Sequence, residues 1–277
     1  MDVSARGFTF EVVVSGPPST DGQPPVLFLH GFPQNHAMWD RVEAFLHGMG
    51  QTTIVMDQRG YSPGARPADV SAYAIGECVS DVIAVLDQLD VPKVHLVGHD
   101  WGAVVAWHVA AEHPDRVATL TALAVPHPTA FGEAIATDDD QQQRSAYFHL
   151  FRQEGKAESV LLRDNGEPMR AMFAGCPPER VETYVAPMLE PGALTAALNW
   201  YRAMGRSMAC PEVRVPTTYV WGERDIAVGR AAARACAAHV VGPFQFETLD
   251  ASHWMADEMP EQISEIILER IKGADAA

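Results

Sequence analysis

Hydrophobic residues in this chain fall into short continuous runs bounded by Gly, Pro or Asp. Five such runs occupy residues 8–16, 25–31, 52–60, 94–100 and 117–126, and each is rich in Val, Leu, Ile or Thr. Continuous apolar runs of this length are typical of strands buried on both faces. They therefore predict the inner strands of a covered sheet.

The segments between these runs have a different period. Residues 38–50, 74–89 and 101–114 place apolar side chains three and four positions apart, which is the spacing of an amphipathic helix. In the last segment a single stripe is formed by Ala103, Ala106, Trp107 and Ala110. Strand and helix patterns alternate, which predicts an α/β fold with a mostly parallel twisted sheet and helices on both faces.

The alternation stops after Pro126 and returns only near residue 212. The stretch between them reads as helices and loops, and "TDDDQQQ" is interpreted as a solvated helix start capped by Thr137. Strand patterns return at 216–225 and 244–253, and an amphipathic helix pattern closes the chain at 260–273. We predict a core domain, residues 1–128 and 212–277, interrupted by a helical insertion, residues 129–211.

Composition limits the partners of the chain. With 277 residues and 47% hydrophobic content, it can bury the core of one large domain. Its formal net charge of -16 is repelled by nucleic acid and by anionic membranes, so we expect a small-molecule substrate instead. Four scattered cysteines, no signal-peptide pattern and no membrane-spanning run favour a cytoplasmic protein. We expect no cofactor and no metal, and a homodimer is left open.

One strand pattern ends on a tight turn that carries an acidic residue. Asp100 lies between the strand pattern of 94–97 and the helix pattern that begins at Trp101, with Gly98 and Gly102 two residues to either side. Glycines at this spacing allow a nucleophile elbow, which holds one side chain above the carboxyl edge of the sheet. Taken alone, Asp100 fits an ordinary helix N-cap equally well.

Two further polar residues lie at predicted strand ends, in the order nucleophile, acid, histidine that elbow enzymes use. Asp225 ends "YVWGERD" and His253 follows "FETLDAS". Separately, these are interpreted as a turn residue and a structural histidine. Together with Asp100 they predict a catalytic triad at one edge of the sheet. Glu223 is a second candidate for the acid.

A third strand end, "HGFP" at 30–33, supplies the partners of an oxyanion hole. In an elbow enzyme the backbone N–H after the nucleophile, here that of Trp101, acts with an N–H from this loop, here that of Phe32. We interpret His30 as a structural hydrogen-bonding residue rather than a base.

Six short motifs, spread over nearly the whole chain, resemble those of α/β-hydrolases in the epoxide hydrolase and dehalogenase branch. They are "HGFP" at 30–33, "DQRGYS" at 57–62, "GHDWGA" at 98–103, "VPHP" at 125–128, "WGERD" at 221–225 and "SHW" at 252–254. The resemblance implies that the insertion is a helical cap over the active site. It also implies that two cap tyrosines act as acids, and "RSAYFHLFRQEG" and "ALNWYRAM" make Tyr147 and Tyr201 the candidates. Tyr184 is interpreted as packing.

An aspartate nucleophile suits this branch because a carboxylate with a pKa of about 3.9 is already an anion at neutral pH. It can attack a saturated carbon directly and leave an ester on Asp100. His253, oriented by Asp225, can then activate a water that hydrolyses the ester. Opening an epoxide produces an alkoxide that needs acids such as Tyr147 and Tyr201, so the prediction is an epoxide hydrolase.

Two alternatives remain open. A hydrolytic dehalogenase would use the same triad but needs only weak donors for its halide. Against it, the resemblance to haloacetate dehalogenases in "HGFPQNHAMW" does not extend to the Arg expected after the nucleophile, where Trp101 stands. A ligand receptor built on a hydrolase fold would need no working triad.

Overall fold

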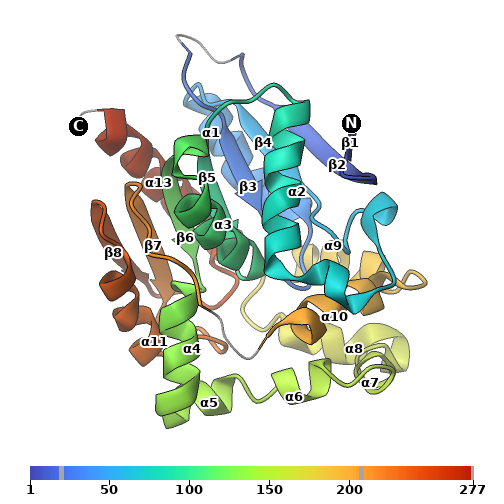
Figure 1. Cartoon of the computed structure of the whole chain (residues 1–277). Coiled ribbons are helices and arrows are strands. Elements are labelled where there is room, and N and C mark those ends of the chain that lie inside the picture. Colours follow the sequence, from blue (N-terminus) through green and yellow to red (C-terminus); the bar gives the residue numbers. More distant parts are fainter. Residues whose placement is uncertain (19–21, 206–208, 276–277) are drawn as a thin grey trace.

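The computed structural model of the chain describes residues 1–18, 22–205 and 209–275. In this part of the chain eight strands form one sheet, in the order β1-β2-β4-β3-β5-β6-β7-β8 (Figure 1). The strands are β1 (Asp2–Ala5), β2 (Phe8–Ser15), β3 (Val26–Leu29), β4 (Thr53–Met56), β5 (Val94–His99), β6 (Val117–Leu123), β7 (Thr217–Gly222) and β8 (Phe244–Leu249). The six strands from β3 to β8 are parallel, and β2 pairs antiparallel with both β1 and β4.

Helices cover both faces of the sheet. On one face α2 (Ile75–Gln88) packs against α3 (Trp101–Glu112), and both lie in front of the sheet in Figure 1. On the other face α1 (Asp40–Gly48) packs against α13 (Pro260–Asp275). The predicted α/β architecture with a mostly parallel sheet is confirmed.

Helix α3 is more enclosed than its sequence pattern indicates. The pattern predicts one apolar stripe, but every residue from Trp101 to Ala110 is buried. The reason is that α3 is covered by the sheet and α2, while its first residue packs edge-on against Trp200 and Tyr201 of α10 (Ala193–Ala203). Residue 100 therefore sits at the base of a fully packed helix.

Strand β1 is not predicted by the sequence. It is four residues long, and only Val3 and Ala5 alternate into the core. It joins β2 through a turn in which Arg6 and Gly7 both have positive φ, 52° and 82°. An alternation over four residues is too short to separate from chance.

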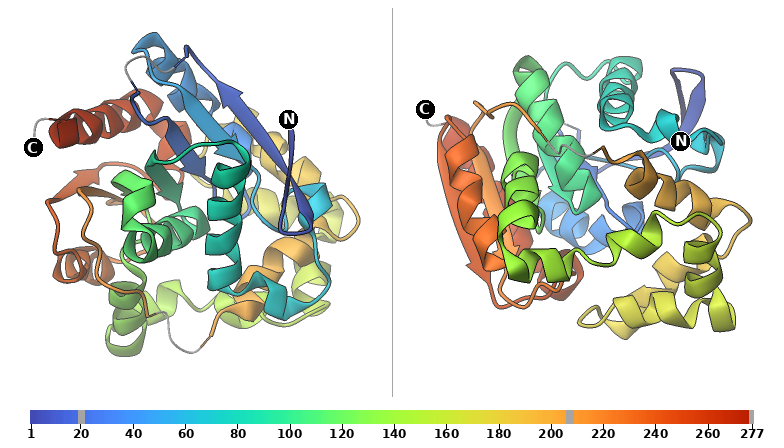
Figure 2. Two further views of the ribbon diagram at one scale, coloured as in Figure 1. Left: turned by 45° about the horizontal axis from the view of Figure 1, so that its top comes forward. Right: turned by 60° about the horizontal axis from the view of Figure 1, so that its bottom comes forward.

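Seven helices of the described chain lie between β6 and β7. They are α4 (Pro128–Thr137), α5 (Asp139–Arg144), α6 (Phe148–Phe151), α7 (Lys156–Leu161), α8 (Arg163–Met172), α9 (Pro178–Met188) and α10. They lie beyond the carboxyl ends of the parallel strands, at the bottom of Figure 1 and toward the viewer in the right-hand view of Figure 2. The short helices α11 (Arg230–Ala235) and α12 (Met255–Glu258) follow β7 and β8.

The prediction for "TDDDQQQ" is wrong in two respects. Asp138, not Thr137, caps α5, because its side chain accepts from the N–H of Gln141, while Thr137 ends α4 and donates to the carbonyl of Glu133. Gln141 is also fully buried rather than solvated. Its amide donates to the carbonyl of Ala227 and accepts from the N–H of Gly229, so tertiary contacts bury this one residue while its neighbours in the run stay largely exposed.

Candidate active site

Asp100 stands on a strained turn between β5 and α3. Its backbone has φ 53° and ψ -120°, a conformation that residues other than glycine rarely adopt. The turn lies directly against the end of β3. Because of this close approach, a Cβ at Gly102 would overlap the carbonyls of Leu29 and His30, and only glycine fits there. This is the nucleophile-elbow geometry, and it directs the carboxylate away from the sheet.

The two oxygens of the Asp100 carboxylate have different neighbours. Oδ1 accepts from the backbone N–H of Phe32 at 2.7 Å, and Oδ2 lies 3.5 Å from Nε2 of His253. Burial opposes ionisation of this carboxyl group. His253, His99 and the backbone N–H of Trp101 outweigh that effect, so the pKa of Asp100 lies below its usual range. The nucleophile candidate is therefore an anion with one oxygen held and the other facing the imidazole.

His253 lies between two carboxylates. Its Nδ1 is 2.8 Å from Oδ2 of Asp225, whose other oxygen accepts from the N–H groups of Ala227 and Val228. Burial disfavours the charged imidazole, but Asp225 and Asp100 outweigh it and raise the pKa of His253 to about 10. Asp225 thus holds the ring so that Nε2 faces Asp100.

Glu223, the second candidate for the acid, does not enter this arrangement. Its exposed side chain pairs instead with Arg230, at 3.1 Å. The loop of Asp225 has additional support from the insertion, because Arg144 of α5 donates to the Asp225 carbonyl at 2.5 Å. Together with the two hydrogen bonds of Gln141, this contact fixes residues 225–229 against α5.

Tyr147 and Tyr201 come from the insertion and meet above Asp100. Their ring centroids are 6.1 Å apart, and both rings line the same cavity as the Asp100 carboxylate. Burial raises the pKa of both hydroxyls, and the nearby Asp100 charge adds to the effect. Both phenols therefore stay protonated and can act as hydrogen-bond donors or acids.

The cavity has a volume of about 280 Å³. It is lined by Phe32, Asp100, Tyr147, Phe151, Leu161, Met172, Tyr201, Ile226, Ala227, His253 and Trp254. Apart from Asp100, His253 and the two tyrosines, the lining side chains are aliphatic or aromatic. All seven predicted site residues meet at this cavity. The cavity is lined by the side chains of Phe32, Asp100, Tyr147, Tyr201 and His253. Asp225 supports His253 from behind, and the backbone N–H of Trp101 binds Asp100.

The family model for the alpha/beta hydrolase fold matches residues 24–260. The chain belongs to the α/β-hydrolase family. It is 31% identical over 282 residues to AB hydrolase superfamily protein YfhM of Bacillus subtilis (strain 168), with 98% of this chain and 96% of that protein covered. It is 30% identical over 280 residues to epoxide hydrolase 3 of Xenopus tropicalis, with 96% and 75% covered.

Solved structures agree with this assignment. Epoxide hydrolase A from Mycobacterium thermoresistibile is similar to this hydrolase with a TM-score of 0.85 and 26% identity, over 99% of this chain and 98% of that one. The epoxide hydrolase of Bacillus megaterium, with a TM-score of 0.88 and 24% identity over 98% and 100%, supports the fold alone. The predicted membership of the epoxide hydrolase family within the α/β-hydrolases is confirmed.

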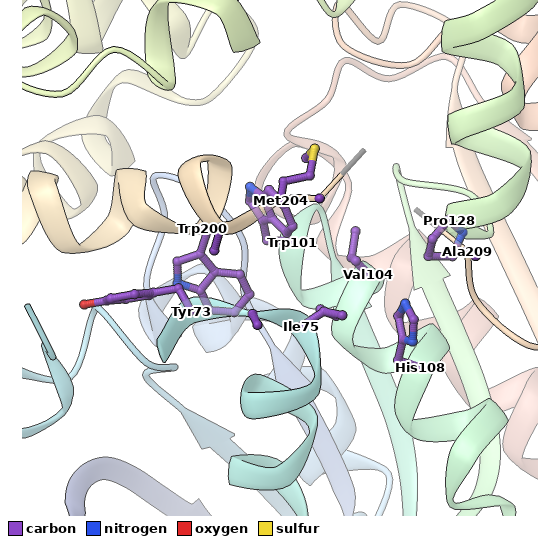
Figure 3. A pocket seen from close by; sticks show the side chains of 12 residues that line it. Tyr73, Ile75, Trp101, Val104, His108, Pro128, Trp200, Met204 and Ala209 are labelled. Carbon is purple, nitrogen blue, oxygen red and sulfur yellow. The ribbon is translucent and has the colours of Figure 1, made fainter. Parts of the chain in front are cut away.

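A second pocket of this hydrolase is lined in part by Trp101, the residue after Asp100 (Figure 3). Its volume is about 220 Å³, and Tyr73, Ile75, Val104, His108, Trp200 and Met204 are among its lining residues. The described residues that line it include no carboxylate and neither of the two paired tyrosines. We therefore take the cavity of Asp100 as the candidate active site. Among the described residues no cluster of His, Cys, Asp and Glu could hold a metal ion, and no helix is long and apolar enough to cross a bilayer.

Sequence reasoning missed residues that support the site from behind. His99 is buried, and its Nε2 lies 2.8 Å from the carbonyl of His253. Burial lowers the pKa of His99 to about 4, so it stays neutral beside the charged His253. Its position next to Asp100 in "GHDWGA" was the available signal. Tyr184, interpreted as packing, also donates its hydroxyl to Asp257.

Proposed function

We propose that this chain is an epoxide hydrolase that converts an epoxide to a vicinal diol through an ester on Asp100. One observation carries the proposal: a carboxylate, a histidine and two protonated tyrosines line a single cavity. These are the nucleophile, the base and the acids that the reaction requires. The relatives whose names identify them as epoxide hydrolases support the same substrate class.

The first step uses Asp100 and the tyrosines. Oδ2 of Asp100 attacks an epoxide carbon while Oδ1 stays bound to the N–H of Phe32. The carbon–oxygen bond of the ring breaks, and the resulting alkoxide takes a proton from Tyr147 or Tyr201. Without such a proton the alkoxide is a poor leaving group, so the two phenols favour an epoxide over a halide as the substrate.

Forming the ester changes the state of His253. The charge of Asp100 disappears, and with it one of the two carboxylates that raise the pKa of His253 to about 10. The pKa then falls, and the imidazolium releases its proton, which restores the deprotonated phenol. His253 is now the neutral base that the second step needs. Formation of the ester on Asp100 thereby converts His253 from the protonated to the neutral form.

The second step hydrolyses the ester. His253 takes a proton from water, and the hydroxide attacks the ester carbonyl carbon of Asp100. The N–H groups of Phe32 and Trp101 stabilise the oxyanion that forms, because they already stabilise this carboxylate in the free protein. The intermediate collapses by breaking the bond between the carbonyl carbon and the ester oxygen, and the departing alkoxide takes the proton of the new carboxyl group. The products are the diol, the Asp100 carboxylate and protonated His253. The new hydroxyl oxygen of the diol comes from Asp100 and not from the water.

The insertion, residues 129–211, acts in this proposal as a cap. It carries Tyr147 and Tyr201, and its Phe151, Leu161 and Met172 form the apolar roof of the cavity. With about 280 Å³ and apolar walls, the cavity suits an epoxide with an apolar body. A ligand receptor would not need the Asp225–His253 pair directed at Asp100, so that alternative loses support.

A single-turnover reaction in heavy-oxygen water tests the covalent route. With the protein in excess over a styrene-oxide-type substrate, we expect diol without the label, followed by label in the Asp100 carboxylate. In a parallel multiple-turnover reaction with substrate in excess, diol from turnovers after the first should carry the label, which serves as the control. Labelled diol in the first turnover would show direct attack by water and refute the ester.

A further inference from the structure

A second buried carboxylate lies close to the site but takes no part in the chemistry described above. Asp257 is on α12, four residues after His253, and only 2% of its surface is exposed. A carboxylate removed from water in this way is unfavourable unless other groups replace its hydration. The hydrogen-bond donors around Asp257 therefore show which segments of the chain it connects.

The Asp257 carboxylate collects donors from two distant segments. Nε2 of Gln34, in the loop after β3, donates at 2.8 Å. The remaining donors belong to the insertion: the Tyr184 hydroxyl at 2.8 and 2.9 Å, Nε of Arg180 at 3.0 Å and Sγ of Cys176 at 3.8 Å. Core loop, insertion and the segment after His253 therefore meet at one side chain.

Arg180 extends this connection along α9. It donates to the carbonyl of Ala37 and lies 3.4 Å from the carboxylate of Asp40, at the start of α1. A neighbouring hydrogen bond joins Nδ2 of Asn35 to the carbonyl of Thr183 at 3.0 Å. Helix α9 is thus fixed to the core at several points around Asp257.

Two routes of contact lead from Asp257 to the residues that would hydrolyse the ester. The polar route runs through Gln34, two positions after Phe32, whose N–H binds Asp100. The aromatic route runs from the Tyr184 ring to Phe173 at 5.4 Å, then to Trp254 at 4.5 Å and on to the ring of His253 at 5.0 Å between centroids. Both routes end at groups of the second step.

A buried ion pair of this kind is weak evidence for stability, because the desolvation of both charges offsets their attraction. What such a network does specify is geometry, since every donor must be in place to satisfy the carboxylate. Formation of the ester depends on the Asp100 elbow and the two tyrosines, none of which contacts Asp257, and in that step the Phe32 N–H only holds Oδ1 of Asp100. In hydrolysis the Phe32 N–H must stabilise an oxyanion and His253 must activate the water. The polar route reaches the first of these groups and the aromatic route reaches the second.

We propose that Asp257 is a positioning residue that holds the Phe32 loop, the His253 segment and helix α9 in the arrangement needed to hydrolyse the ester. The inference rests on the proposed function, because it assigns Asp257 to one of the two covalent steps. It predicts that loss of the carboxylate slows ester hydrolysis much more than ester formation.

The test measures both steps by rapid quench and mass spectrometry of the ester. In Asp257→Asn, which keeps the side-chain shape, we expect hydrolysis to slow by about tenfold or more while formation stays within about threefold. Tyr184→Phe removes one donor and keeps the ring, so its effect should have the same sign and be smaller. The ratio of the two rate constants does not depend on how much of the protein is folded.

Asp81→Asn is the matched control. Asp81 is also 2% exposed, and it is held by Arg59 at 2.6 Å and Arg6 at 2.8 Å, but these contacts do not reach the cavity. It should lose stability and keep the wild-type ratio. Equal slowing of both steps in Asp257→Asn, or a ratio equal to that of Asp81→Asn, would overturn the inference while leaving the ester route intact. Absence of any ester in the wild type would overturn the proposed function and this inference with it.

Discussion

Two regions of this hydrolase each contain a buried aspartate, and they use it in opposite ways. Asp100, at the β5–α3 junction, is 7% exposed, and its Oδ2 faces the cavity with His253 3.5 Å away. Asp257, at the junction of α12 and α9, is 2% exposed, and both its oxygens accept hydrogen bonds of 3.0 Å or less. Burial alone therefore does not make a carboxylate reactive. In the proposed function Asp100 reacts because its carboxylate borders the cavity, with Oδ2 beside the His253 ring, whereas both oxygens of Asp257 are engaged by supporting donors.

The largest effect should come from removing the charge of Asp100. Asp100→Asn keeps the shape and should lower turnover by about 10⁴-fold or more, because no other group on the cavity wall is an anionic nucleophile. Epibromohydrin carries both leaving groups, so diol and bromide can be followed in parallel. The same variant should lower the pKa of His253, measured by NMR titration, because one of its two carboxylate partners is neutralised. Turnover close to that of the wild type would assign the nucleophile elsewhere.

The next effect concerns the acids above Asp100. The double variant Tyr147→Phe, Tyr201→Phe should slow ring opening by about 10²-fold or more, since the alkoxide loses its proton donors. Tyr219→Phe is the control, because that buried hydroxyl donates to the carbonyl of Ala124 and not to the cavity. Prompt bromide release with the ring intact, unchanged in the double variant, would instead identify a dehalogenase with two packing tyrosines.

The smallest effect should be that of pH on ester formation. The pKa of Asp100 lies below its usual range and those of Tyr147 and Tyr201 lie above theirs, so all three keep their working state from about pH 5 to pH 9. Formation should vary by less than about threefold over that range. Hydrolysis should increase with pH, since it needs neutral His253, and its midpoint should lie below the value of about 10 in the free protein. Rapid-quench measurements at each pH give the rates of ester formation and ester hydrolysis separately. A rate of hydrolysis that falls as pH rises would contradict the role of His253 as the base.

Much of the candidate site could be predicted because its signals are local. Gly98, Asp100 and Gly102 mark an elbow within five residues, and Asp225 and His253 follow strands whose carboxyl ends share one edge of a parallel sheet. The inner strands can be recognised by their continuous apolar runs, because both of their faces are buried. For these features, the residues that determine the local structure are close together in the sequence.

The features that sequence reasoning missed depend on contacts between distant segments. Gln141 lies in a run of Asp and Gln that reads as solvated, and only the loop of Ala227 and Gly229, more than 80 positions away, makes it a buried hydrogen-bonding residue. Asp257 and Gln34 are separated by 223 positions. Such pairs leave no periodicity in the sequence, since each partner alone is an ordinary polar residue.

The left-handed backbone of Asp100 has a consequence for how this position can change over evolutionary time. A residue with φ 53° and ψ -120° costs the folded state about 1–3 kcal/mol, a cost that glycine largely avoids. Selection for a durable fold would therefore favour glycine at position 100, and selection for chemistry opposes it. In a duplicated copy released from that chemistry, position 100 is where we expect drift toward glycine to begin.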